Sequence, residues 1–274
     1  MAESDRFAKW SPFDSGEDFS RYVGRPEHQY LIASTQRSGS YFLSYLLRET
    51  GQLGFPLEYL HPEHAPMWQQ RFGVCSMREV MLELFERRTS PNGWFGIKAH
   101  WPHFVWAREQ GLDDLLTFDR FIRIERKDRL AQAVSLALAR KTKAWVSLQE
   151  NGPAPDYDGG AITRALNTLD RQSRKWDGWS RNSGVEPVRI FYEDLVADPL
   201  AAVNHVLNEF GLRPVVTLPP VPVRKQASTL NKEWIRRYNA RTERLKRMLK
   251  WAGRSILPAG AVQRARAGAH RGAG

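Results

Sequence analysis

Short apolar segments alternate with stretches of helical periodicity along the first 210 residues of the chain. The apolar segments have the composition of buried strands and cover residues 30–33, 94–98, 118–125 and 186–192. Apolar residues at three- and four-residue spacing predict helices at residues 41–50, 74–88, 103–111, 130–145, 161–180 and 200–210. Because strands that alternate with helices pair in parallel, we expect an α/β fold with a single parallel β-sheet flanked by helices on both faces.

The remaining segments predict how the chain is divided. Residues 193–199 read as a turn-like stop after the last strand. Four prolines between residues 214 and 222 form a stiff linker. An amphipathic helix is predicted at residues 231–251, and the Ala-, Gly- and Arg-rich end should be disordered. We therefore expect three parts: an N-terminal extension (1–28), a main domain that includes the last helix (29–252) and a disordered basic tail (253–274).

The formal net charge of +11 belongs to the C-terminal end of the chain. Residues 222–274 contain 14 lysines and arginines against two glutamates, so the rest of the chain is close to neutral. This charge suits contact with a membrane surface. Nucleic-acid binding would leave the neutral part unexplained, so we expect no specific nucleic-acid partner. A homodimer is compatible with the sequence.

Cysteine content and hydropathy bear on the compartment. A single cysteine, Cys75, excludes an intramolecular disulfide and any cluster of cysteine metal ligands. The first 26 residues lack the apolar core of a secretory signal, and the longest apolar run, residues 130–139, is too short to span a bilayer. We expect a cytoplasmic protein, with peripheral contact at the inner face of the membrane as an option that the basic tail leaves open.

A small, polar loop follows the first strand and precedes a helix. Its serine and threonine hydroxyls can donate to an anion, Gly39 lets the backbone approach it, and Arg37 offers a planar fork for phosphate oxygens. The loop is not a Walker A motif, because no lysine precedes Ser40 or Thr35. It predicts an anion site, and the alternative is an ordinary strand-to-helix turn.

Two further segments carry residues suited to catalysis. Lys98 and His100 lie two positions apart at the end of the second strand and should point to the same side. The proline-flanked connection 54–62 should be stiff and non-helical, and it contains Glu58. Histidines and glutamates gather there, but their spacing matches no helical metal motif, so we expect no metal.

Several motifs together resemble the sulfotransferases that use 3′-phosphoadenosine 5′-phosphosulfate (PAPS), and most of all the bacterial trehalose sulfotransferase-like branch, which acts on carbohydrates. Ser34-x-x-Arg37-Ser38-Gly39-Ser40 resembles the 5′-phosphosulfate loop of that family. Arg126-x-Asp128 with Gln132-Ala133-Val134-Ser135 is similar to its 3′-phosphate motif. Gly54-x-Pro56-x-Glu58-Tyr59 is similar to the segment with the branch's proposed catalytic glutamate.

The resemblance covers roughly residues 29 to 240 and implies a P-loop-like sulfotransferase fold. It assigns the 3′-phosphate to Arg126 and Ser135, and it places Tyr192, in Phe191-Tyr192-Glu193-Asp194-Leu195, near the adenine. Lys225 stands where the family has arginine in a C-terminal donor-binding segment. The 5′-phosphosulfate would be held by Gln36, Arg37, Ser38, Gly39, Ser40 and Tyr41. No metal is implied, because the donor is already activated.

One departure leaves two candidates for the general base. Lys98-Ala99-His100 is like the Lys-Thr-His of the eukaryotic cytosolic enzymes, in which the histidine is the base and the lysine assists the leaving group. The unperturbed pKa of histidine suits base work near neutrality, whereas a glutamate would need burial to raise its pKa. Proximity to the branch favours Glu58, with His100 and Arg37 stabilising the transferring group.

These motifs predict an enzyme that moves a sulfuryl group from PAPS to a hydroxyl of a carbohydrate or glycolipid by in-line displacement. Trp68, Trp101 and Trp106 are candidates to stack on a sugar. The alternatives are a P-loop-type small-molecule kinase and a nucleotide- or anion-binding protein with a basic tail for membranes or nucleic acid. A kinase should show a Walker lysine and an aspartate for Mg²⁺ at a strand end, and this chain shows neither clearly.

Overall fold

Strand β1 (His28–Ser34) lies inside a four-stranded sheet, and only its first residue is exposed. Its neighbours are β2 (Trp94–His100) on one side and β3 (Arg120–Glu125) on the other, and β4 (Pro187–Phe191) lies outside β3. All three pairs are parallel, and Ser34 at the end of β1 stands opposite His100 at the end of β2. The predicted four-stranded parallel sheet and α/β class are confirmed.

The structure is a computed structural model that describes residues 11, 13–143, 145, 154–221 and 229–255, with side chains to residue 248. The chain divides into two compact units, Met1–Ala227 and Ser228–Gly274. In the second unit, helix α10 (Thr229–Ser255) includes residues 253–255, which were expected to belong to the tail. Residues 256–274 and Lys225 lie outside the described residues.

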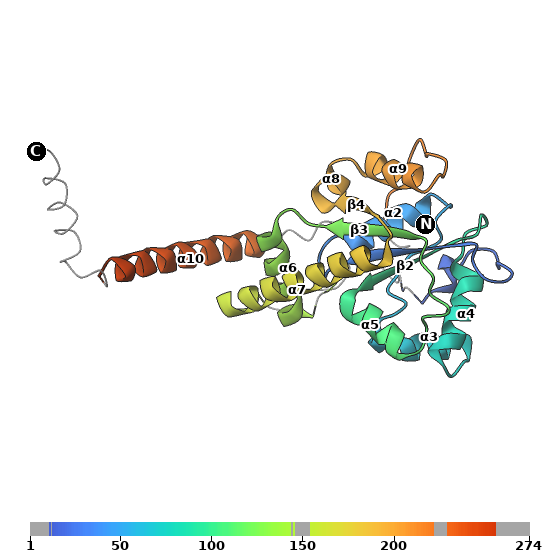
Figure 1. The fold of residues 1–274 in the computed structure, drawn as a ribbon, viewed down its shortest axis with the longest axis horizontal. Helices are drawn as coiled ribbons and strands as arrows, with labels where there is room; N and C mark the ends of the chain where they lie inside the picture. Colours follow the sequence, from blue (N-terminus) through green and yellow to red (C-terminus); the bar gives the residue numbers. More distant parts are fainter. Residues whose placement is uncertain (1–10, 12, 144, 146–153, 222–228, 256–274) are drawn as a thin grey trace, which may run out of the picture. The chain divides into compact units, whose positions relative to one another are not determined.

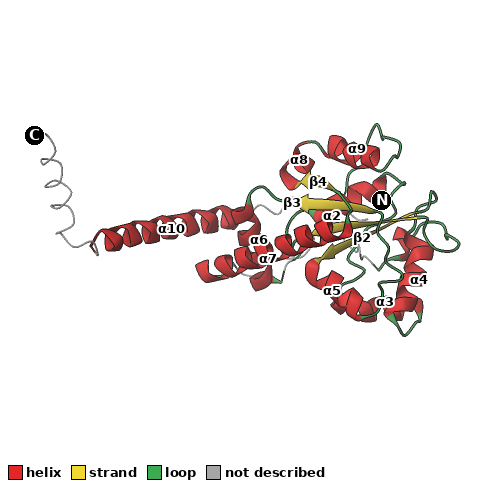
Figure 2. Cartoon of the chain, in the orientation of Figure 1, coloured by secondary structure: helices red, strands yellow, loops and turns green. Residues whose placement is uncertain are grey.

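Alternation along β1 sends its side chains into two hydrophobic cores, one on each face of the sheet. Tyr30 and Ile32 pack with helix α2 (Ser40–Glu49), α8 (Tyr192–Ala197) and α9 (Pro199–Glu209). Figure 1 shows α8 and α9 above the strands, and Figure 2 shows the strands as a layer between helices. Leu31 and Ala33 face the opposite core, which is covered by α3 (Ala65–Phe72), α4 (Met77–Arg88), α5 (Trp101–Glu109) and α7 (Gly159–Ser183).

The first unit also contains helix α6 and two short 3₁₀ turns. Helix α6 (Arg129–Thr142) makes its main contacts with α7, and the short 3₁₀ turns are η1 (Ser15–Glu17) and η2 (Pro62–His64). None of the helices in the described part of the chain combines the length and hydrophobicity needed to cross a membrane.

Two helices differ from the prediction. Residues 193–199 were expected to turn, but Tyr192–Ala197 form the six-residue helix α8, which is too short for periodicity to reveal. It stops where Asp198, whose side chain accepts from the Ala201 N–H, caps α9. Helix α3 was also missed. Its Trp68 is 1% exposed in the core, so this tryptophan does not face a sugar.

Candidate active site

The residues singled out by the sequence gather at the carboxyl edge of the sheet. Because the strands are parallel, the loop after β1, His100 at the end of β2, Arg126 after β3 and Tyr192 after β4 all come to this edge. After β1 the chain adds β2 on one side of this strand and then crosses to add β3 on its other side, so the strand order changes direction at β1. Open α/β sheets bind ligands at such a switch point.

The loop between β1 and α2 is held in a defined conformation. Arg37 adopts a left-handed backbone with φ of 63°, and Gly39 follows with φ of 86° as the N-cap of α2. Gly39 has no side chain with which to cap this helix, so the N–H groups of its first turn are suited to another acceptor. The buried Gln132 side chain secures the loop by donating to Thr35 Oγ1 at 2.9 Å and to the Gln36 carbonyl at 2.7 Å.

The hydroxyls of this loop have different partners. Ser34 Oγ lies 3.1 Å from the Ala99 carbonyl, and Thr35 Oγ1 accepts from Gln132, so both serve the internal structure. Ser38 Oγ is buried and has no hydrogen-bond partner among the described residues. A buried hydroxyl without a partner is costly, which makes Ser38 the hydroxyl of this loop best suited to meet a ligand.

Gly39 leaves no room for a side chain, which gives a first prediction. A Cβ at this position would lie 2.3 Å from the Tyr192 ring, on a backbone that already disfavours L-residues. Gly39→Ala should therefore cost about 3 kcal/mol in free energy of unfolding, measured with urea, from strain and overpacking together. Gly51→Ala is the matched control: φ is 68° but nothing lies within 4 Å, so about 1 kcal/mol is expected. Equal losses would mean that the Tyr192 contact is unimportant.

Two guanidinium groups meet beside this loop. Arg37 Nε donates to Ser135 Oγ at 2.9 Å, and its Nη1 donates to the Trp145 carbonyl. Arg126 lies over the Tyr192 ring at 4.8 Å. Burial, with the nearby Arg126 charge, lowers the pKa of Arg37 to about 10. Two cations held close together in a partly buried place form a site that a multiply charged anion would stabilise.

The turn after β3 fixes the position of Arg126. Glu193 accepts from the backbone N–H groups of Lys127 at 2.9 Å and Asp128 at 3.2 Å, and lies 3.8 Å from Arg126 Nε. The motif resemblance paired Arg126 with Ser135, whereas the structure gives the Ser135 hydroxyl to Arg37. Both arginines and Ser135 nevertheless belong to one cationic cluster.

At the β2 side of the edge, three ionisable side chains meet. Glu58 Oε1 accepts from Lys98 Nζ and lies 3.0 Å from His100 Nε2. His100 Nδ1 lies 2.9 Å from Ser34 Oγ, which fixes the ring. Lys98 Nζ also lies 3.8 Å from the centre of the Tyr41 ring, in the first turn of α2. Lys98 therefore lies between the Glu58 carboxylate and the loop that joins β1 to α2 (residues 35–39), which we call the anion loop.

Burial and charge act in opposite directions on the pKa values of Glu58 and Lys98. Burial alone would raise the pKa of the Glu58 carboxyl, but Lys98 and His100 outweigh burial and hold that pKa well below its usual value. Burial lowers the pKa of Lys98, and Glu58 opposes this effect. The condition set above for a glutamate base, a pKa raised by burial, is therefore not met in this structure, because Lys98 and His100 are in direct contact with the carboxylate.

Backbone pairing explains how Glu58 reaches this place. Gly54 has φ of 61°, and a Cβ there would lie 2.5 Å from the Arg88 carbonyl, so only glycine fits this turn. The chain then extends, and Leu57 forms a parallel bridge with Ile97 while its carbonyl accepts from the Lys98 N–H at 3.0 Å. Glu58 follows directly, beside the end of β2. The non-helical course predicted here is confirmed as far as residue 61, and η2 begins at Pro62.

Histidines surround the carboxylate. The ring centres of His100 and His103 are 5.2 Å apart, those of His103 and His61 4.3 Å, and those of His61 and His64 4.4 Å. The motifs did not include His103, which lies one turn into α5 and is 8% exposed. The feature of the sequence that could have indicated His103 is its position, three residues after His100. Its Nδ1 is buried without a hydrogen-bond partner among the described residues.

His103 gives a prediction for pH dependence. Burial lowers the pKa of His103 to about 2, so the folded protein keeps this ring neutral while the unfolded chain takes up a proton below pH ~6.5. The free energy of unfolding should thus fall by about 2 kcal/mol from pH 6.5 to pH 5, at ~1.4 kcal/mol per pH unit. His103→Gln should remove much of this slope in urea titrations. The exposed His205→Gln should keep it, and an unchanged slope in His103→Gln would contradict the assignment.

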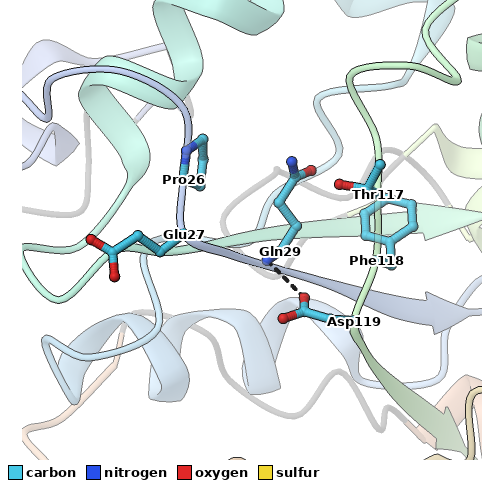
Figure 3. A pocket seen from close by; sticks show the side chains of 6 residues that line it. All are labelled: Pro26, Glu27, Gln29, Thr117, Phe118 and Asp119. Atoms are coloured by element: carbon cyan, nitrogen blue, oxygen red, sulfur yellow. Dashed lines mark hydrogen bonds between the residues drawn. The ribbon is translucent and has the colours of Figure 1, made fainter.

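Other parts of the described chain add little to this site. A shallow pocket lies at the opposite, amino edge of the sheet, where Gln29 N–H donates to Asp119 at 2.9 Å (Figure 3). It is far along the strands from the carboxyl edge and holds no catalytic group. Within the described residues, no three His, Cys, Asp or Glu side chains are placed to hold a metal ion together.

Comparison with known proteins identifies the family. The family model described as Stf0 sulphotransferase matches residues 29–94 and 99–241. Trehalose 2-sulfotransferase of Mycobacterium tuberculosis (strain ATCC 35801 / TMC 107 / Erdman) is 29% identical over 267 residues, covering 81% of this chain and 98% of the relative. That of Mycolicibacterium smegmatis (strain ATCC 700084 / mc(2)155) is 27% identical over 256 residues, covering 78% and 96%.

Solved structures give weaker likenesses. A sulfotransferase from Alicyclobacillus acidocaldarius aligns with a TM-score of 0.46 and 14% identity, over 83% of this chain and 97% of the other. The sulfotransferase domain of the Synechococcus PCC 7002 olefin synthase aligns with a TM-score of 0.41 and 16% identity, over 71% and 76%.

The resemblance read from the motifs is confirmed by the family model, which spans the anion loop, Glu58, Arg126 and Tyr192: the chain belongs to the Stf0 sulphotransferase family.

Proposed function

We propose that this sulfotransferase takes its sulfuryl group from PAPS and transfers it to a hydroxyl of a carbohydrate or glycolipid. The observation that carries the proposal is the position of the Glu58–Lys98–His100 trio, which shares one sheet edge with the anion loop and the two arginines. A base and a cationic donor site at one edge is what transfer from an anionic donor to a hydroxyl requires.

The proposed donor site has two parts, one for each charged group of PAPS. PAPS carries a 5′-phosphosulfate and a 3′-phosphate, and each needs its own set of donors. The uncapped first turn of α2 and Ser38 suit the phosphosulfate. The resemblance gave Arg37 to the phosphosulfate, but its hydrogen bond with Ser135 favours the 3′-phosphate for the cluster of Arg37, Arg126 and Ser135. The Tyr192 ring beside Gly39 suits the adenine.

In the reaction, a bond forms between the acceptor oxygen and sulfur, and the bond between sulfur and the bridging phosphate oxygen breaks. The acceptor proton goes to Glu58, and 3′-phosphoadenosine 5′-phosphate (PAP) leaves. Lys98 contacts Glu58 and the first turn of α2, so it can stabilise the charge that grows on the bridging oxygen. As Lys98 shifts its interaction toward that oxygen, the carboxylate loses a cationic partner and its pKa rises, which makes Glu58 a stronger base during transfer.

The acceptor would enter beside the histidines. His61 and His103 flank Glu58 with rings whose pKa burial lowers, so they are neutral near pH 7. Nδ1 of His61 accepts from the Glu63 N–H at 3.2 Å, so in the neutral ring Nε2 carries the proton and can donate to a sugar hydroxyl. The relatives named as trehalose 2-sulfotransferases support a sugar as the acceptor class, and they supply trehalose as the first compound to test.

Ligand-dependent thermal unfolding tests the donor assignment. PAP in the presence of EDTA should raise Tm clearly, whereas ATP with Mg²⁺ and duplex DNA should raise it little. A kinase would respond to ATP with Mg²⁺ and not to PAP. A rise with ATP–Mg²⁺ alone would overturn the proposal.

A further inference from the structure

Helix α10 carries far more positive charge than a helix needs for solubility. Residues 229–255 contain nine lysines and arginines against Glu233 and Glu243. Both acids are already paired, Glu233 with Arg237 at 3.2 Å and Glu243 with Lys246 at 2.8 Å. Two acids cannot neutralise nine bases, so the helix keeps a large net positive charge.

The same helix exposes apolar side chains among these charges. Leu245 and Met248 lie one turn apart and are 48% and 57% exposed. Every side chain from residue 243 to residue 248 is exposed. On a helix of 3.6 residues per turn, Leu245 and Met248 fall on the same face as Trp234 and Arg241, while Arg244 and Lys246 flank Leu245 on either side. Trp234 is 1% exposed, so Leu245 and Met248 are the apolar side chains that this part of the helix offers to a partner.

Three kinds of partner for the exposed, positively charged face of α10 can be compared: a second copy of α10, nucleic acid and an anionic lipid surface. A second copy of α10 would bring two strongly positive helices together, and their repulsion opposes pairing. Nucleic acid would satisfy the charge but gives no use to an exposed leucine and methionine. An anionic lipid surface uses both features, because headgroups attract the arginines while Leu245 and Met248 enter the boundary of the acyl chains.

We propose that α10 is a docking helix for membranes that contain anionic lipids. Long lysine and arginine side chains beside Leu245 and Met248 extend toward the headgroups while their stems cover apolar surface. This binding is independent of the donor assignment, because none of the residues involved lies in the candidate active site.

Co-sedimentation of the full chain with vesicles tests the proposal. Vesicles of phosphatidylglycerol and phosphatidylcholine are compared with pure phosphatidylcholine, at low and high salt. The variant R241Q/R244Q/R247Q removes three charges and should weaken binding to the anionic vesicles about 100-fold, at about fivefold per charge. L245Q/M248Q should also weaken it, by about tenfold or more.

The matched control removes the same number of arginines from another helix. R171Q/R174Q/R181Q changes three exposed arginines of α7, which has nearly the same length. It should bind the anionic vesicles as the unchanged chain does, and circular dichroism checks that each variant folds. Failure of the unchanged chain to bind anionic vesicles, equal losses in the two arginine variants, or full binding by L245Q/M248Q would each overturn the proposal. Tighter binding to duplex DNA than to vesicles would instead assign the helix to nucleic acid.

Discussion

Glu58→Gln is expected to lower turnover with PAPS by about 100-fold or more and to leave PAP affinity unchanged. A general base contributes typically ~10²–10⁴-fold, and the glutamine cannot take the acceptor proton. Its amide oxygen can still accept from Lys98, so the local structure should survive. Initial rates at saturating donor measure the loss, and calorimetric titration of PAP shows whether the donor site is intact.

Two further variants make the result specific to Glu58. Glu63→Gln changes an exposed carboxylate five residues away in the same segment and should be nearly silent. His100→Ala should cost less than Glu58→Gln, because the ring contacts the carboxylate and Ser34 and acts here by positioning Glu58. If His100→Ala cost more, the base role would pass to His100. Near-normal rates in both variants would leave the mechanism without its base.

Arg126→Ala should weaken PAP binding about 10- to 100-fold and leave 5′-AMP almost unaffected. The two nucleotides differ in the 3′-phosphate, and losing a charge-assisted contact costs about 1.5–3 kcal/mol. Arg126 lies on the Tyr192 ring and close to Arg37, so its removal also lowers the local positive charge. Isothermal titration of both nucleotides into the same protein measures the difference.

Lys127→Ala is the control for Arg126. Lys127 is the next residue, but its ammonium pairs with Asp194 at 2.6 Å and is half exposed. Its replacement should leave the preference for PAP over AMP as it was. Equal losses of PAP and AMP affinity in Arg126→Ala would mean that this arginine stabilises the loop and does not read the 3′-phosphate.

Much of the sheet could be predicted from the sequence, because buried parallel strands are continuous apolar runs. Once four strands are placed, parallel pairing brings the residues at their ends to one edge, and so the loop, His100, Arg126 and Tyr192 can be grouped from the sequence alone. Helix α8 cannot be found in this way, since six residues cover fewer than two turns, too few for a repeating pattern. Its first residue, Tyr192, can still be found, because it follows β4 directly.

Contacts between side chains from different elements are harder to foresee. Nothing in the sequence indicates that Ser135 bonds with Arg37 instead of Arg126, because that choice depends on the left-handed backbone at Arg37. Glu58 and His100 are rivals for one role in the sequence, yet they are in contact. Their contact depends on the bridge between Leu57 and Ile97, a single pairing that leaves no periodic signal.

The decisive measurement is the transfer of label from PAPS to an acceptor. The enzyme is incubated with PAPS labelled in its sulfuryl group, in EDTA, with trehalose and with a panel of other sugars and glycolipids. Label is expected to appear in a sugar or glycolipid product in a one-to-one ratio with PAP, and Glu58→Gln is expected to abolish most of it. Release of the label only as inorganic sulfate, or PAPS left unconsumed with every acceptor, would contradict the proposed transfer.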